Sequence, residues 1–213
     1  MGERASGGPS NAIRVLLASS NAGKLREYRA MATGTAVDID LMPNFRNHPA
    51  FDECALTFAE IGAAKALHYS RFADEIVLAD DSGLVVPALD GAPGVRSARY
   101  AGANATDAQN NRKLLAEMEG REGDARRARF VCVTALARSG RALAVISGSA
   151  EGLILKEPRG AGGFGYDPLF FSRELGCTFA EAPAREKNCL SHRGKAFAKI
   201  VALLTDQNIL TLS

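Results

Sequence analysis

The sequence predicts an α/β protein with a mixed β-sheet flanked by helices. In the first half of the chain, apolar runs of strand length alternate with segments that have helical spacing, which is typical of β-α-β-α-β order. The second half contains a predicted long hairpin and a further strand, which add antiparallel pairing. At 213 residues, with 46% hydrophobic and 23% charged residues, the chain has the composition of a globular domain with a substantial core.

The first predicted elements are a strand at residues 13–18, a small polar loop at 19–24, and a helix. This arrangement aims backbone N–H groups and a positive helix end at the space above the loop, which suits a phosphate, and Lys24 would add a mobile charge. The loop is not a Walker A motif, because residue 18 is alanine and residue 25 is leucine. The alternative is that Ser20 only caps the helix and Lys24 lies in solvent.

A second strand and a second helix follow. Residues 37–41 alternate apolar and acidic side chains, as a half-buried strand does, and residues 57–60 have the form of a capping box that opens a helix. Glu53, just before that helix, is a candidate second metal ligand. The alternative interpretation is that Glu53 is a loop carboxylate exposed to water.

The central stretch, residues 76–100, carries the acidic side chains that suggest chemistry. An apolar strand at 76–79 leads to Asp80, Asp81 and Ser82, and a glycine turn is predicted at Gly83. Successive strand side chains point to opposite faces, so one aspartate is expected to face a cleft. There it can hold Mg²⁺ or accept a proton from a metal-bound water. The alternative is an ordinary Asp-Ser-Gly turn.

The remaining elements complete the sheet. A loop is expected at 87–94, and a capping box at 106–109 starts a helix that stops at Gly120. Strands are predicted at 128–137, 142–147 and, as the third strand of a meander, at 148–156. A closing helix follows residues 191–195.

Residues 160–168 hold four glycines around Phe164 and Tyr166. They contain G-x-G-x-x-G, but Pro168 and an apolar run follow where a Rossmann helix should start, so that interpretation fails. The composition favours a loop in which backbone approaches a flat ligand and an aromatic ring stacks on a base. An aromatic-anchored turn is the alternative.

Composition excludes several classes of protein. A formal net charge of +2, with scattered basic residues, does not favour nucleic-acid or membrane binding, and no apolar stretch is long enough for a membrane span. Residues 1–12 lack an apolar segment typical of a secretory signal and are expected to form a disordered tail. The four cysteines lack metal-site spacing and are expected to be reduced thiols of a cytoplasmic protein.

Five motifs in order carry a family resemblance. They are Ser-Asn-x-x-Lys-x-x-Glu at 20–27, Ala-Asp-Asp-Ser-Gly-Leu at 79–84, Gly-Ala-Pro-Gly-Val-x-Ser-Ala-Arg-Tyr at 91–100, Gly-Gly-Phe-Gly-Tyr-Asp-Pro at 162–168 and Ser-His-Arg-Gly at 191–194. Together they resemble the inosine triphosphate pyrophosphatase family, also called XTP/dITP diphosphatases. The resemblance implies Mg²⁺-dependent hydrolysis of ITP, dITP and XTP to the monophosphate and pyrophosphate, by a homodimer. It also implies an elongated mixed sheet, with residues 13–213 as one two-lobed domain and the active site in the cleft.

The resemblance also implies roles for individual residues. Asp81 would be catalytic and metal-binding, with Glu53 as second metal ligand. The substrate-binding residues would be Ser19, Ser20, Asn21, Ala22, Gly23, Lys24, Ser82, Phe164, Gly165, Tyr166, Asp167, Lys187, His192 and Arg193. The chain departs from the family pattern at Cys54-Ala55, Pro87 and Arg96, and the first departure bears on the metal role of Glu53.

Two other functions stay open from the sequence. The chain could be a pyrophosphatase for other nucleotides such as dTTP or UTP, which a panel of triphosphates would separate. It could also be a nucleotide-binding module without turnover, which would bind ITP tightly and release no product.

Overall fold

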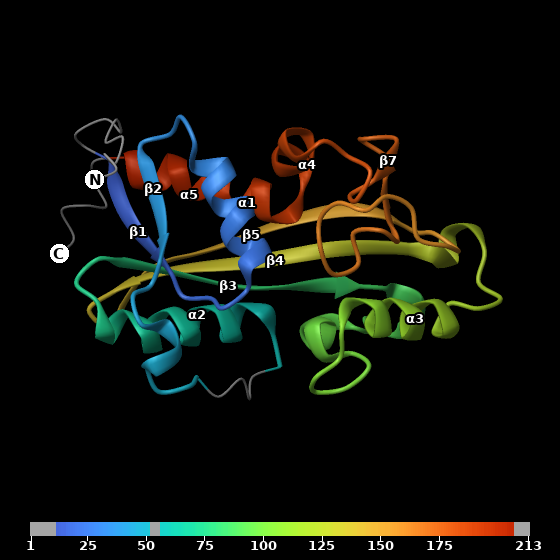
Figure 1. The fold of residues 1–213 in the computed structure, drawn as a ribbon, viewed down its shortest axis with the longest axis horizontal. Coiled ribbons are helices and arrows are strands. Elements are labelled where there is room, and N and C mark those ends of the chain that lie inside the picture. Colours follow the sequence, from blue (N-terminus) through green and yellow to red (C-terminus); the bar gives the residue numbers. More distant parts are fainter. Residues whose placement is uncertain (1–11, 52–55, 207–213) are drawn as a thin grey trace, which may run out of the picture.

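The computed structural model describes residues 12–51 and 56–206 of the chain, and within them a seven-stranded sheet in the order β2-β1-β3-β4-β5-β6-β7 (Figure 1). The strands are β1 Ile13–Leu17, β2 Val37–Leu41, β3 Ile76–Val85, β4 Arg127–Arg138, β5 Arg141–Ile154, β6 Phe170–Ser172 and β7 Cys177–Thr178. The helices are α1 Ala22–Ala32, α2 Phe58–Tyr69, α3 Asp107–Glu117, α4 Ala184–Leu190 and α5 His192–Thr205.

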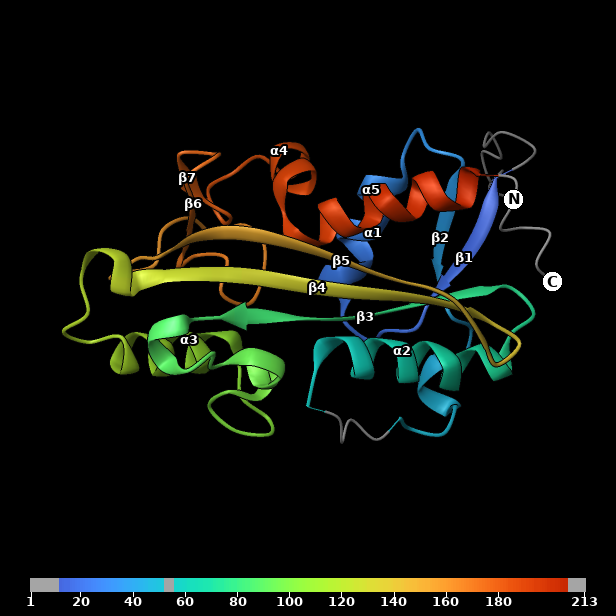
Figure 2. The ribbon, with the colours of Figure 1, turned by 180° about the vertical axis from the view of Figure 1, so that it is seen from behind.

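The sheet is mixed, as predicted. β1 pairs in parallel with β2 and β3, whereas every pairing from β3 through to β7 is antiparallel. Three long strands, β3, β4 and β5, run along the length of the molecule and give it an elongated form (Figures 1 and 2). The α/β class and the mixed sheet are therefore confirmed. The two-lobe division stays a prediction, and the predicted tail lies, apart from Ala12, outside the described residues.

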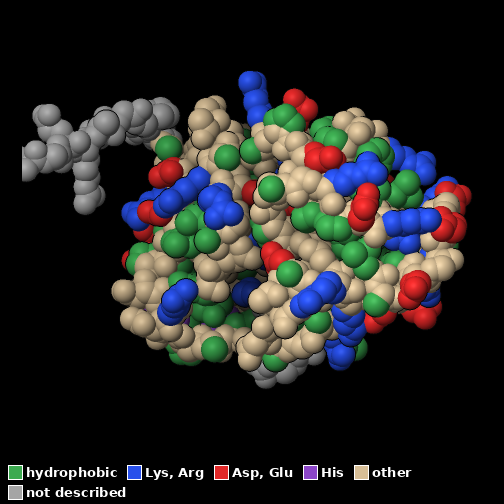
Figure 3. All heavy atoms as spheres, turned by 45° about the vertical axis from the view of Figure 1, so that its right-hand side comes forward, with side chains coloured by type: hydrophobic (Ala, Val, Ile, Leu, Met, Phe, Trp, Pro, Cys, Tyr) green, Lys and Arg blue, Asp and Glu red, His purple; other side chains and the backbone are tan. Residues whose placement is uncertain are grey.

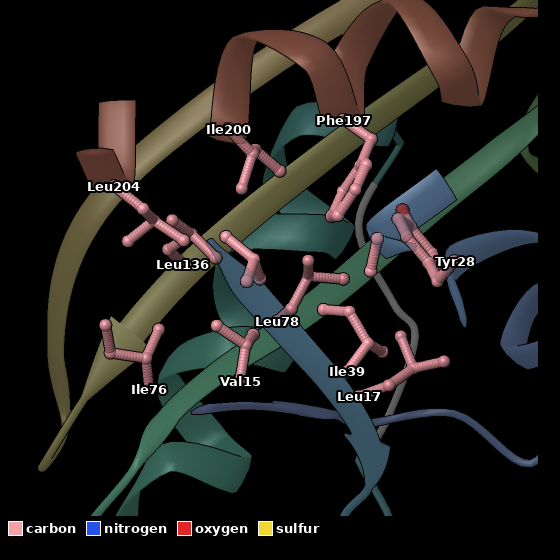
Figure 4. Packing of buried hydrophobic residues seen from close by; sticks show 12 residues of the cluster. Val15, Leu17, Tyr28, Ile39, Ile76, Leu78, Leu136, Phe197, Ile200 and Leu204 are labelled. Carbon is pink, nitrogen blue, oxygen red and sulfur yellow. The ribbon is translucent and has the colours of Figure 1, made fainter. Parts of the chain in front are cut away.

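Helices cover both faces of the sheet. α1, α4 and α5 lie on one face, and α2 and α3 lie on the other (Figures 1 and 2). Phe197, Ile200 and Leu204 of α5 point onto the strands, where they pack with Leu78 and Tyr28 (Figure 4). The closing helix predicted after residues 191–195 is therefore confirmed, and Phe197, Ile200 and Leu204 lie on its buried face.

Among the described residues the core has three clusters, and two of them show the side-chain alternation of β3. Leu78 packs on the α1 and α5 face, whereas Val77 and Ala79 pack in a second cluster with Ala66 of α2. A third cluster, at the other end of the sheet, includes Leu114 of α3. Alternation therefore places Asp80 on the α1 and α5 face and Asp81 on the α2 face.

The predicted turn at Gly83 is wrong. β3 continues to Val85, and Gly83 pairs with Val131 of β4 inside a continuous ladder. The glycine serves close packing, because a Cβ built there would lie 2.4 Å from Ser97 Oγ and 2.5 Å from the carbonyl oxygen of Gly94. Glycine in a strand interior can mark such a close backbone approach as well as a turn.

The predicted third strand at 148–156 is also wrong. β5 is one strand of 14 residues, Arg141–Ile154, and it pairs with β4 along nearly its whole length. β6, which pairs with the end of β5, occupies that place in the meander instead. No local signal divides β5, because small and polar residues at 147–149 are compatible with a long half-exposed strand.

One edge of β3 is open where the acidic residues lie. β1 ends at Leu17 and pairs with β3 only as far as Leu78, so among the described residues no strand pairs with that edge from Ala79 to Leu84. The chain leaves β1 across this gap, where the N–H of Ala18 donates to the carbonyl oxygen of Leu78 at 2.8 Å. Crevices beyond the carboxyl ends of parallel strands are common ligand sites.

Candidate active site

A cavity of about 450 Å³ opens at this edge of β3, within the size range of small-molecule sites. It brings together most of the residues predicted from the motifs. Those that line it are Ser19, Ser20, Asn21, Lys24, Asp81, Ser82, Phe164, Gly165, Tyr166, Asp167, Lys187, His192 and Arg193. Ala22 and Gly23 do not line it, and Glu53 lies outside the described residues. The surface in Figure 3 is hollowed, with Lys or Arg side chains in and around the hollow.

The first loop is ordered by Asn21. This residue is the N-cap of α1, and its Oδ1 accepts hydrogen bonds from the N–H groups of Gly23 at 2.8 Å and Lys24 at 3.1 Å. Ser20 is therefore not the cap. Two of the N–H groups that the sequence predicts for a phosphate are already bonded to Asn21, so the loop offers fewer backbone donors than expected.

Lys24 is held in place, contrary to the expected mobile charge. Its Nζ lies 2.9 Å from Asp80 Oδ1 and 3.2 Å from the Asp80 carbonyl oxygen. Burial alone would raise the pKa of Asp80, but the charges of Lys24 and Arg193 outweigh burial and hold that pKa well below its usual range. Asp80 is therefore a buried counter-ion, only 2% exposed.

The two aspartates of β3 have different surroundings, as the alternation of strand side chains predicts. Asp81 is half-buried and lines the cavity, whereas Asp80 does not line it. Of the two carboxylates, that of Asp81 lines the cavity, and the catalytic and metal-binding roles that the family resemblance implies for it stay predictions.

Arg193 joins three parts of the chain. Its Nε donates to Asp80 Oδ2 at 3.2 Å, its Nη1 to Glu27 Oε2 at 2.5 Å and its Nη2 to Ser82 Oγ at 2.7 Å. Described residues therefore engage three of the five N–H donors of the guanidinium group, although the side chain still lines the cavity.

Glu27 links Arg193 to Lys187. Lys187 Nζ lies 2.6 Å from Glu27 Oε1 and 2.5 Å from Asp167 Oδ2. Burial would raise the pKa of Glu27, but the charges of Arg193 and Lys187 keep that pKa below its ordinary value. A continuous chain of buried and partly buried ion pairs thus runs from Lys24 through Asp80, Arg193, Glu27 and Lys187 to Asp167.

Residues 160–168, here called the glycine-aromatic loop, form one wall of the cavity. The half-buried Phe164 ring has its centroid 5.4 Å from Lys187 Nζ and 5.5 Å from Arg193 Cζ. The N–H of Phe164 donates to Asp167 Oδ2 at 2.8 Å, which closes the loop on itself. Tyr166 is buried, and its hydroxyl donates to the carbonyl oxygen of Ser97 at 2.8 Å, so it anchors the loop rather than presenting a free ring.

His192 is a neutral, buried side chain at the start of α5. Its ring stacks on Phe130 with centroids 4.6 Å apart. Burial, together with the charges of Arg193 and Lys187, lowers its pKa well below the ordinary value. Its Nδ1 is buried and makes no hydrogen bond to a described residue. A neutral imidazole of this kind can donate or accept one hydrogen bond to a ligand.

Sequence reasoning missed several residues of this site. Glu27 and the counter-ion role of Asp80 were not predicted, although Glu27 follows Lys24 by three positions, a spacing that puts both on one face of a helix. The additional polar lining residues include Lys65, Ser97, Arg99, Asp107 and Asn110. Ser97 and Arg99 belong to the motif at 91–100, to which the sequence assigned no role in the site, whereas Lys65, Asp107 and Asn110 belong to none of the five family motifs.

Comparison with known proteins confirms the family resemblance. The Ham1 family matches residues 15–203. The dITP/XTP pyrophosphatase of Geobacillus kaustophilus is 47% identical over 186 residues, covering 87% of this chain and 91% of that protein. The dITP/XTP pyrophosphatase of Geobacter sulfurreducens is 48% identical, covering 87% and 93%.

Solved structures agree as well. A HAM1 protein from Coxiella burnetii has a TM-score of 0.80 at 39% identity, covering 91% of this chain and 99% of that one. A nucleoside-triphosphatase, or dITP/XTP pyrophosphatase, from Mycobacterium abscessus has a TM-score of 0.67 at 35% identity, covering 90% and 99%. With its five motifs, its mixed sheet and its matched length, this chain belongs to the Ham1 family.

Proposed function

We propose that the protein hydrolyses deaminated purine nucleoside triphosphates, namely ITP, dITP and XTP, to the monophosphate and pyrophosphate. Relatives that bear the name dITP/XTP pyrophosphatase and match most of the chain support this function. The observation that carries it is one cavity lined by Asp81 of β3, Lys24 of α1 and Phe164 of the glycine-aromatic loop. A carboxylate can hold a metal ion, a lysine can pair with phosphates, and an aromatic ring can stack on a base.

The residues present fit Mg²⁺. Within the described part of the chain no cluster of three His, Cys, Asp or Glu side chains could hold a metal ion on its own. Mg²⁺, however, is commonly bound through one or two carboxylates together with substrate phosphates, and Asp81 presents one carboxylate to the cavity. Asp81 would hold the ion, with Glu53 as the predicted second ligand. When bound, the ion would neutralise charge that develops on the phosphates.

The phosphate end of the site is built from α1 and its loop. Lys24 is fixed by Asp80 before any substrate arrives, so its position costs no reorganisation when a polyphosphate binds. Lys65 of α2 and Arg99 also line the cavity and bring further positive charge to it. The hydroxyl groups of Ser19 and Ser20 supply neutral donors at the same end.

The base end is built from α4, α5 and the glycine-aromatic loop. Arg193 retains donors beyond those engaged by Asp80, Glu27 and Ser82, and His192 is neutral. Donors directed at the 6-oxo group of hypoxanthine or xanthine would form hydrogen bonds with it. Adenine has an amino group at that position and would leave these donors unpaired. A buried donor without a partner can reduce the rate for the wrong substrate by several orders of magnitude.

Asp81 would be the residue that acts on the reacting phosphates. It can bind the metal ion or accept the proton of the attacking water, since both roles need an ionised carboxylate in the cavity. The neighbouring Ser82 is held by Arg193, so its hydroxyl oxygen is already oriented.

Other expected properties stay predictions. The homodimer and the cytoplasmic location are implied by the resemblance and by cysteine usage, and neither nucleic acid nor membrane is expected as a partner. Among the described helices, none is long and apolar enough to cross a membrane.

The test is pyrophosphate release from ITP, XTP, dITP, GTP, ATP, dTTP and UTP, each with Mg²⁺ and with EDTA. The proposal expects kcat/KM for the three deaminated substrates to exceed that for ATP by at least about 100-fold. It also expects no release with EDTA. Faster hydrolysis of dTTP or UTP would assign the protein to other nucleotides. Tight binding of ITP without product would make it a binding module.

A further inference from the structure

Side chains of helix α3 hold two walls of the cavity by hydrogen bonds to the backbone of each wall. Asn110 Oδ1 accepts a hydrogen bond from the N–H of Ala101 at 2.8 Å, and its Nδ2 donates to the carbonyl oxygen of Ala98 at 3.1 Å. These contacts fix the end of the 3₁₀ segment η4, Gly94–Arg99, which forms one wall.

The other wall is held at Gly165. Asp107 Oδ2 accepts a hydrogen bond from the N–H of Gly165 at 2.7 Å, and Asn111 Nδ2 donates to the carbonyl oxygen of Gly165 at 2.9 Å. Two side chains of one helix thus bind both polar groups of a single residue in the glycine-aromatic loop. Gly165 has a φ of +64°, a conformation that glycine adopts without strain.

The helix is suited to act as a support. Asp107 and Asn111 are four residues apart and therefore project from the same face. A full capping box, Thr106 with Gln109, closes the N-terminus, and Leu114 is buried in the core. A side chain on a helix that is itself anchored holds a loop better than a side chain on another loop.

The held residue lies beside Phe164. The Phe164 ring packs against α1, since a Cβ built on Gly23 would lie 2.7 Å from the ring. The ring thus contacts α1, and α3 holds the backbone of the residue that follows it. Loss of the Gly165 contacts would release the backbone next to the ring.

We propose that Asp107 and Asn111 are positioning residues that hold Gly165, and through it the Phe164 ring, at the base-binding end of the cavity. This inference rests on the proposed function, because it takes the ligand beside Phe164 to be a purine. Removing either contact should weaken binding of the base while leaving the phosphate end unchanged.

The experiment compares Asp107→Ala and Asn111→Ala with the conservative Asp107→Asn and with Arg112→Ala, which changes an exposed residue of the same helix. For each variant, kcat and KM are measured with dITP and Mg²⁺, and inhibition is measured with inorganic tripolyphosphate, which has no base. Hydrogen exchange of the Gly165 amide is followed as a readout that needs no substrate.

We expect KM for dITP to rise about tenfold in each alanine variant, with kcat and the inhibition constant for tripolyphosphate within about twofold. Asp107→Asn should keep KM within about threefold, because its amide oxygen can still accept from Gly165. Gly165 exchange should accelerate in Asp107→Ala and not in Arg112→Ala.

Three results would overturn the inference: unchanged KM in both alanine variants, unchanged exchange of the Gly165 amide, or an equal loss of tripolyphosphate binding, which would indicate general damage. If the unmodified protein does not hydrolyse dITP, the proposed function fails instead. The exchange measurement then still decides whether α3 holds Gly165.

Discussion

Replacing Arg193 with alanine tests the buried ion-pair chain directly. Arg193 is only 2% exposed, and its guanidinium group lies 3.2 Å from Asp80 Oδ2 and 2.5 Å from Glu27 Oε2. The substitution therefore removes a partner that both carboxylates share. Breaking a buried ion pair by deleting one partner typically costs about 3–5 kcal/mol. Each carboxylate keeps a lysine, Lys24 or Lys187, so we expect the lower end of that range, about 3 kcal/mol.

The expected loss is large enough to measure by thermal unfolding. For a domain of this size, about 1 kcal/mol shifts Tm by roughly 2–4 °C, so Arg193→Ala should lower Tm by roughly 6–12 °C at pH 7. The control is Arg127→Ala, which breaks an ion pair with Asp124 whose side chains are 61% and 71% exposed. Such exposed pairs contribute about 0–1 kcal/mol, so Tm should change little.

The pH dependence has a definite sign. The pKa values of Asp80 and Glu27 lie below their ordinary values of 3.8 and 4.5, so their stabilising effect is present at neutral pH and is lost as the pH falls below those values. Without Arg193 both folded-state pKa values rise. The difference in unfolding free energy between the two proteins should therefore narrow between pH 7 and pH 3.

The reasoning would be refuted by either of two results. A Tm loss no greater than that of Arg127→Ala would show that the buried contacts of Arg193 do not stabilise the fold. A difference in unfolding free energy that stays constant down to pH 3 would show that its effect does not depend on the ionised carboxylates.

Three further predictions concern the site and β3. Asp81→Asn should lower kcat for dITP at least about 1,000-fold with Tm within about 2 °C, measured by pyrophosphate release and thermal unfolding; near-normal turnover would remove Asp81 from the mechanism. Removing Mg²⁺ with EDTA should abolish pyrophosphate release and excess Mg²⁺ should restore it, whereas unchanged activity would exclude the metal role. Gly83→Ala should reduce the unfolding free energy by about 1–3 kcal/mol in urea titrations, because its Cβ would meet Ser97 Oγ and the Gly94 carbonyl; an unchanged midpoint would contradict that packing.

The order of elements could be predicted because its signals are local. Alternating polarity at 37–41 predicts the bounds of β2, and the capping box at Thr106 predicts the start of α3. The same local signals mislead where a residue serves a distant contact. The residues around Gly83 are typical of a turn, yet Gly83 lies in a strand. Glycine is needed there because a side chain would collide with Ser97 and Gly94.

The sequence by itself determined the fold class, most element positions and, through five motifs in order, the family. Only the tertiary structure decided how the charges pair. Glu27 and Lys187 are 160 residues apart along the chain, and Asp80 and Arg193 are 113 apart, so no periodicity links them. Strand alternation predicts that Asp80 and Asp81 face opposite ways. Which one lines the cavity depends on the helices packed on each face, because the arginine and lysine that bury Asp80 come from α5 and α1.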